Sequence, residues 1–139
     1  MFVDASAVFA ILNHEPERQA LLQALEQSPT PLLYSPLSRF EAIVSLARNR
    51  AGPHRSATEG EIDAVAAGVD LFLSQLDATC LDLTASIGTR ALTAAKTYGR
   101  AVGHPAALNL GDCFAYACAK ERGVGLLYKG GDFAQTDLG

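Results

Sequence analysis

Two carboxylates stand where apolar segments of the chain end. Asp4 follows the apolar start "MFV", and Asp132 follows the segment "VGLLYKGG" near the other end. Taken singly, Asp4 fits the N-cap of a helix and Asp132 fits a turn after two glycines. Ligands of open parallel sheets bind outside the carboxyl ends of the strands. If both segments are strands of such a sheet, the two acids face the same rim.

A third carboxylate, Glu41, lies on the apolar face of an expected helix. Leu37 is four residues before it and Val44 is three residues after it, which is the spacing of one helix face. A charge on a face that packs against a sheet costs several kcal/mol unless it is paired or bound to a cation. Two interpretations follow: an ion pair with Arg48, seven residues further on, or a functional carboxylate.

The fourth carboxylate, Asp112, lies in "LNLGDCFAYACAK". Asn109 and Asp112 have the spacing of a capping box, in which the acid reaches back to the N–H of the cap. The residues that follow are unusually apolar, so we expect a central, buried helix from Asp112 to about Arg122. Its N-terminus would open at the same rim.

Carboxylates gathered at one rim repel one another, and holding them together without a cation is unfavourable. Oxygen ligands of this kind suit Mg²⁺ or Mn²⁺. Such ions polarise a phosphodiester, activate a water and stabilise the leaving oxygen. The sequence has no zinc-binding spacing, Walker loop or dinucleotide-binding glycine motif. The pattern therefore predicts metal-dependent phosphoester chemistry.

Strand and helix patterns alternate along the 139 residues, which predicts one α/β domain over 1–139, with a mainly parallel sheet and helices on both faces. The expected strands are 1–4, 30–36, 78–83 and 124–128. The expected helices are 5–13, 15–27, 36–50, 59–76, 84–98 and 112–122. The loop "AGPHRSATEGE" reads as a hinge inside this domain.

Composition narrows the class of protein. The chain is 49% hydrophobic and 19% charged, as in globular domains, and no apolar run reaches the roughly 18 residues of a membrane span. The N-terminus has no basic region and Asp4 interrupts its apolar start, so we expect a cytoplasmic protein without a signal peptide. Three cysteines without CxxC spacing (Cys80, Cys113 and Cys118) predict buried, inert thiols.

The net charge is −4, which argues against a nucleic-acid-binding surface but suits a site that collects cations.

Four segments resemble the PIN-domain ribonuclease toxins of the VapC family. They are "MFVDASAVFAIL" with "EPE", "SRFEAIVSLARNR", "LNLGDCFAYACAKERG" and "LLYKGGDFAQTDL", in matching order and spacing over the whole chain. By this resemblance Asp4 and Asp112 are the principal metal ligands, and Glu41 and Asp132 complete the pocket or orient water. Ser6 stands at the position of a family hydroxyl. Relatives often carry Asp, Glu or Asn where this chain has Gly131.

The resemblance also implies a three-layer α/β/α sandwich, usually paired as a homodimer. The implied activity is Mg²⁺-dependent endonucleolytic cleavage of RNA, commonly tRNA or ribosomal RNA. The implied partner is a VapB-type antitoxin, whose tail would cover the acidic pocket. Metals would then supply much of the positive charge that meets the phosphate. Further phosphate contacts are expected among Arg39, Arg48, Arg50, Arg55 and Lys129, and best in the cluster at 48–55 that includes His54.

Two rival interpretations stay open at this point. A haloacid-dehalogenase-like phosphatase also has an Asp after its first strand, with a late Lys and a late "GD….D", which Lys129, Asp132 and Asp137 could imitate. That family needs a second Asp two residues after the first, where this chain has Ser6. The other rival is a PIN-like binding module that has lost catalysis, and retention of all four acids argues against it.

Overall fold

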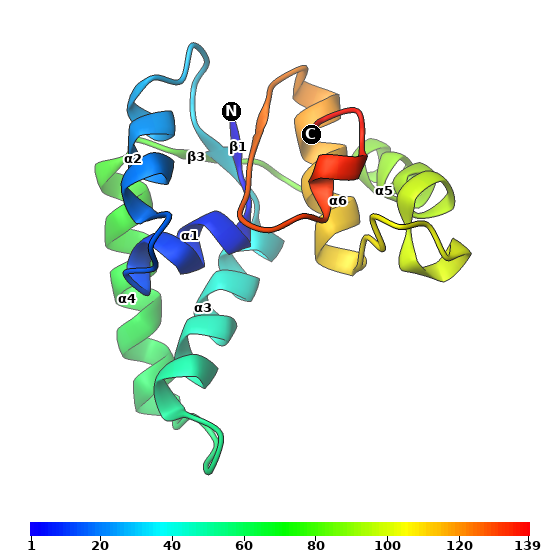
Figure 1. Ribbon diagram of the computed structural model, residues 1–139. Helices are drawn as coiled ribbons and strands as arrows, with labels where there is room; N and C mark the ends of the chain where they lie inside the picture. The colour runs from blue at the N-terminus through cyan, green and yellow to red at the C-terminus, as the bar shows by residue number, and fades with distance from the viewer.

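A computed structural model describes residues 1–139, which form a four-stranded parallel sheet between two layers of helices (Figure 1). The strands are β1 (Phe2–Val3), β2 (Leu33–Tyr34), β3 (Thr79–Cys80) and β4 (Leu126–Leu127), in the order β3-β2-β1-β4. The predicted α/β/α sandwich is confirmed. All four strands lie inside the predicted segments but are shorter, because only two residues of each pair with a neighbour.

The first strand occupies the centre of the sheet. Phe2 pairs with Leu33 on one side and with Leu126 on the other, and Val3 pairs with Leu127. Successive side chains of a strand point to opposite faces. Phe2 accordingly packs in one hydrophobic core and Val3 in the other, and both are fully buried. Asp4 comes next, at the carboxyl end of this central strand.

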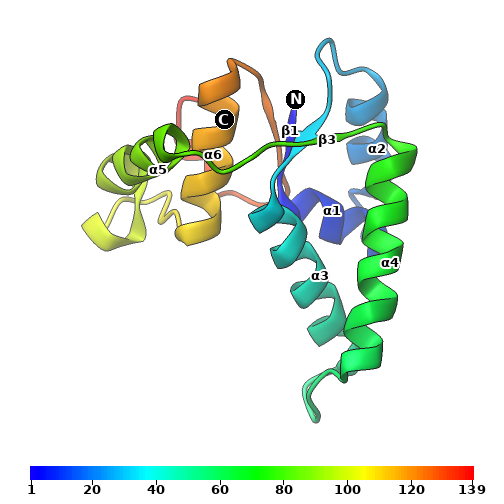
Figure 2. The ribbon, with the colours of Figure 1, turned by 180° about the vertical axis from the view of Figure 1, so that it is seen from behind.

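The helices divide between the two faces of the sheet, as Figure 1 and the reverse view in Figure 2 show. One layer holds α1 (Ala5–Leu12), α2 (Arg18–Glu26), α3 (Pro36–Ala51) and α4 (Glu59–Gln75). The other holds α5 (Ala85–Tyr98) and α6 (Leu110–Arg122). Each layer closes over a core cluster of 15 buried residues, so both faces of the sheet are covered by comparable apolar packing.

Helix caps fix where the site-bearing helices begin. The Asp4 side chain caps α1, and Ser35 caps α3 with Pro36 at its first position, as predicted. Asn109 and Asp112 form the predicted capping box of α6. That helix begins at Leu110 rather than at Asp112, because Asn109 is its cap and Asp112 already lies in the first turn.

The prediction of three buried thiols is wrong for Cys80. Cys113 and Cys118 are buried in α6, but Cys80 is exposed. The strand β3 lies at the edge of the sheet, and both of its residues are exposed, so the apolar run there does not mark a buried position. No helix of the structure combines the length and apolarity that a bilayer-spanning segment needs.

Candidate active site

All four predicted carboxylates line one pocket of about 420 Å³ at the carboxyl ends of β1 and β4. The pocket is built by the starts of α1 and α6, one face of α3, and the two loops that follow α1 and β4. Its lining consists of Asp4, Ala5, Ser6, Phe9, Glu15, Glu41, Ser45, Asn109, Asp112, Lys129 and Asp132.

Asp4 is the most deeply buried of the acids, with 5% of its surface exposed. One carboxylate oxygen accepts hydrogen bonds from the Ser6 backbone N–H at 2.9 Å and from the Ser6 hydroxyl at 2.5 Å. Burial raises the pKa of Asp4 above its ordinary value, and the bonds from Ser6 counteract that rise in part. The nearby charge of Asp132 raises the pKa of Asp4 further. A backbone hydrogen bond from Ala5 also lowers the pKa of Asp4.

Asp112 is held by its capping box. Its carboxylate accepts a 2.9 Å hydrogen bond from the Asn109 backbone N–H, while the Asn109 side chain accepts one from the Asp112 backbone N–H at 2.9 Å. Burial raises the pKa of Asp112 to about 6, the Asn109 bond opposes this, and the charges of Asp4 and Asp132 add to the rise. The helix that carries Asp112 is therefore also what orients it.

Glu41 is half-buried on α3 and forms no hydrogen bond or ion pair. The predicted alternative of an ion pair with Arg48 is wrong, since Arg48 forms no ion pair and is exposed. Burial raises the pKa of Glu41 to about 7, and the charges of Asp4 and Asp112 contribute to this. The side chain meets the first turn of α6, where a Cβ atom at Gly111 would overlap its carboxylate.

The loop after β4 contributes Lys129 and Asp132. Asp132 is exposed and begins a short 3-10 helix at Phe133–Gln135. The Lys129 backbone N–H donates to the Ser6 hydroxyl oxygen at 3.0 Å, which ties this loop to the hydroxyl that supports Asp4. The Lys129 ammonium bonds Glu15 and lies 3.5 Å from Glu17. Lys129 therefore joins the loops after α1 and β4 across the mouth of the pocket.

The donors of this pocket fit a hard divalent cation. They are carboxylate oxygens, and the raised pKa values of three of them reflect unfavourable negative charge that a cation would relieve. No three acidic, His or Cys side chains converge closely enough to hold an ion by themselves. Mg²⁺ commonly uses one or two carboxylates and keeps several waters, so this arrangement is compatible with it.

The five predicted phosphate contacts do not gather at the acids. Only Lys129 lines the acidic pocket. Arg39 forms two hydrogen bonds of 2.6 and 2.8 Å with Asp70, and Arg55 bonds Glu61 in the same two-pronged way. Arg48 and Arg50 have no carboxylate partner, and Arg48 lines a neighbouring hollow.

Sequence reasoning did not assign several residues of the site. Phe9, Glu15 and Ser45 line the pocket, and Gly111 makes room for Glu41. Helical spacing could have indicated Phe9 and Ser45 as site residues. Phe9 lies one helical turn beyond Ser6, and Ser45 lies one turn beyond Glu41. No sequence pattern could have indicated Gly111, since its importance depends on the approach of α3 to α6.

The raised pKa values predict how stability depends on pH. Between the ordinary values of 4.5 for Glu41 and 3.8 for Asp112 and the raised ones, the folded chain binds more protons than the unfolded chain. The free energy of unfolding should therefore fall as pH rises through that window. In EDTA, we expect a higher melting temperature at about pH 5 than at about pH 8, and a flatter profile for Glu41→Gln. Parallel profiles for the two proteins would contradict this assignment.

Comparison with known proteins places this arrangement in a family. Residues 1–138 match the family model of the PIN domain. A VapC ribonuclease of Rhizobium meliloti is 48% identical over 144 aligned residues, which cover 99% of each chain. Ribonuclease VapC42 of Mycobacterium tuberculosis is 35% identical over 138 residues, covering 99% of this chain and 96% of its own.

Solved structures agree on the fold. The sarcin-ricin-loop-cleaving toxin VapC20 of Mycobacterium tuberculosis superimposes with a TM-score of 0.70 at 14% identity, over 99% of this chain and 95% of its own. A toxin–antitoxin complex from Klebsiella pneumoniae gives a TM-score of 0.68 at 18% identity, over 98% and 92%. The family match and the full-length relatives also set aside the phosphatase interpretation. The chain belongs to the PIN-domain family and, within it, to the VapC proteins.

Proposed function

We propose that this protein is the toxin of a type II toxin–antitoxin system and acts as a metal-dependent endoribonuclease. The observation that carries the proposal is the gathering of Asp4, Glu41, Asp112 and Asp132 around one pocket in which none of the four forms an ion pair with an arginine or a lysine. The relatives named as VapC ribonucleases support RNA as the substrate. Transfer RNA and ribosomal RNA are the proposed targets.

In the proposed site, Asp4 and Asp112 hold Mg²⁺ or Mn²⁺, with Glu41 and Asp132 in supporting roles. When bound, the cation would polarise the scissile phosphodiester and lower the pKa of an attacking water. The Ser6 hydroxyl holds one carboxylate oxygen of Asp4 in place at the wall of the pocket. The Glu41 carboxylate lines the pocket without an ion-pair partner, so it would be free to accept a proton from an attacking water.

The proposal extends to assembly and location. We propose a VapB-type antitoxin as partner, a homodimer as the assembly, one PIN domain over residues 1–139, and the cytoplasm as location. An apolar groove of about 550 Å³ between α5 and α6 supports a protein–protein contact. Leu92 and Leu110 on its edge are 61% and 70% exposed. This groove is distinct from the acidic pocket, although Asn109 borders both.

Substitution of the principal ligands tests the reaction. Asp4→Asn and Asp112→Asn should each lower the rate of RNA cleavage by at least about a hundredfold, because each removes a charge that holds the cation. Cleavage of a labelled RNA with Mg²⁺ or Mn²⁺ measures the effect, and Asp63→Asn on the exposed face of α4 is the control. Equal residual activity in all variants would indicate a contaminating nuclease. A correctly folded wild type without activity would favour a PIN-like binding module.

Metal addition tests the cation site independently of cleavage. Binding of Mg²⁺ to the folded state alone should raise the melting temperature, and the rise should grow with metal concentration. The same titration on Asp4→Asn should give a much smaller rise. A wild-type melting temperature that does not change with millimolar Mg²⁺ would count against the cation site.

Gly111→Ala tests whether Glu41 must stay in place. The added methyl group displaces the flexible Glu41 carboxylate rather than backbone, so the fold should persist. Cleavage should fall by about tenfold or more, because a small misplacement of a reacting group is costly. Gly68→Ala is the matched control, since a Cβ at this helical glycine meets nothing within 4 Å. Unchanged cleavage by Gly111→Ala would remove Glu41 from the mechanism.

A further inference from the structure

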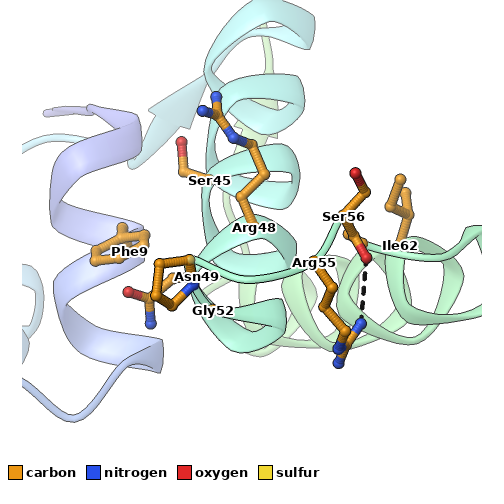
Figure 3. Close-up of a pocket in the computed structure, with 10 residues that line it drawn as sticks. Phe9, Ser45, Arg48, Asn49, Gly52, Arg55, Ser56 and Ile62 are labelled. Atoms are coloured by element: carbon orange, nitrogen blue, oxygen red, sulfur yellow. Dashed lines mark hydrogen bonds between the residues drawn. The ribbon is translucent and has the colours of Figure 1, made fainter.

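A second, larger hollow of about 870 Å³ adjoins the acidic pocket. It lies between α1, the second half of α3 and the loop that leads into α4 (Figure 3). Phe9 and Ser45 line both spaces. Because the two share these walls, a chain that passes over the carboxylates can continue into the hollow.

Arg48 is the basic residue that matters most in this hollow. It is exposed, has no carboxylate partner, and follows Ser45 by three residues and Glu41 by seven on α3. Figure 3 shows its side chain extending back along the helix toward Ser45, as the backward tilt of helical side chains favours. The guanidinium thus extends toward the N-terminal half of α3, which carries Glu41.

The other basic residues considered above are less suited to bind phosphate. Arg39, Arg55 and Lys129 are each bound to carboxylates. Figure 3 also shows Arg55 pointing away from Ser45 and donating to the Ser56 carbonyl at 3.2 Å. Arg50 is as exposed as Arg48 but does not line the hollow. Of these five residues, Arg48 is therefore the one that both lines the hollow and has no carboxylate partner.

Phe9 supplies an aromatic surface at the junction of the two spaces. It is half-buried on α1, so part of its ring is available. Aromatic side chains beside a cationic groove bind single-stranded nucleic acid by stacking on its bases, whatever their sequence.

We propose that Phe9 and Arg48 form a subsite for a nucleotide that flanks the scissile bond, with Arg48 on its phosphate and Phe9 against its base. The proposal rests on the proposed ribonuclease function, because RNA is the substrate that it assigns. The subsite would give this acidic protein affinity for single-stranded RNA beyond that of the cation. It also predicts that short single-stranded segments or loops are cut in preference to paired RNA.

Binding to a fluorescent single-stranded RNA oligonucleotide tests the subsite without cleavage, using Asp4→Asn as the background. Arg48→Ala should weaken binding by about tenfold and reduce the slope of log K against log salt by about 0.7, the value for one lost phosphate contact on a single strand. Arg50→Ala, on the same helix, should change Kd less than about twofold. Equal effects of the two substitutions would mean diffuse attraction and would overturn the subsite.

A single methylphosphonate linkage, which removes one phosphate charge, locates the contact. Moved along the oligonucleotide, it should weaken binding at one linkage and do so only when Arg48 is present. If no linkage behaves in this way, the assignment of Arg48 to a phosphate is overturned. Phe9→Tyr should retain affinity, while Phe9→Leu, which keeps an apolar side chain at the core, should weaken it by about tenfold. Unchanged affinity of Phe9→Leu would overturn the stacking role.

Steady-state cleavage by the otherwise wild-type chain separates this proposal from the function on which it rests. Arg48→Ala should raise KM and leave kcat within about threefold, and Arg48→Lys should restore part of the loss. Cleavage by Arg48→Ala with wild-type KM would overturn the subsite and leave the ribonuclease intact. Binding that depends on Arg48 in a wild type that cleaves no RNA would support the subsite and overturn the function.

Discussion

Carboxylates that share a half-buried pocket repel one another, and the fold places several of them at the end of its central strand. Repulsion and burial together raise the pKa values of Asp4, Glu41 and Asp112. Asp4 is held by Ser6 and Asp112 by Asn109, each through a bond at a helix N-terminus, where negative charge is favoured. Glu41 has no such support and lies against Gly111. The parallel sheet, α3 and α6 keep these groups close together.

The distribution of positive charge explains how an acidic chain can serve RNA chemistry. Three of the five candidate cations are already paired with carboxylates, as Arg39 is with Asp70 and Arg55 with Glu61. Exposed pairs of this kind contribute little to stability, but they reduce the charge available to a phosphate. The proposed affinity for RNA then depends on two sources: a cation held by the acids and the unpaired Arg48 beside them.

Lys129 has a structural role rather than that of a phosphate contact. Its ammonium is bound to Glu15 and its backbone N–H supports the Ser6 hydroxyl, so it connects the loop after β4 with both ends of α1. The carboxylates of Glu15 and Glu17 raise its pKa, and it stays protonated over the physiological range. A cation in this place joins the loop after α1 to the loop that carries Asp132.

The sequence by itself determined what depends on near neighbours. Apolar periodicity gave the order of strands and helices, and cap spacing gave the roles of Asp4, Ser35 and the Asn109–Asp112 box. The placement of the acids at strand and helix ends was enough to predict one rim. Strand lengths and the exposure of Cys80 were not predictable in this way, because they depend on which strand lies at the edge of the sheet.

Only the tertiary structure decided which distant groups meet. It left Glu41 without Arg48, brought it against Gly111, and paired Arg39 and Lys129 with acids from distant segments. It also made Phe9 and Ser45 common walls of two spaces. These outcomes depend on how α1, α3 and α6 approach one another. Side-chain packing across the whole domain sets that approach, and local sequence spacing does not encode it.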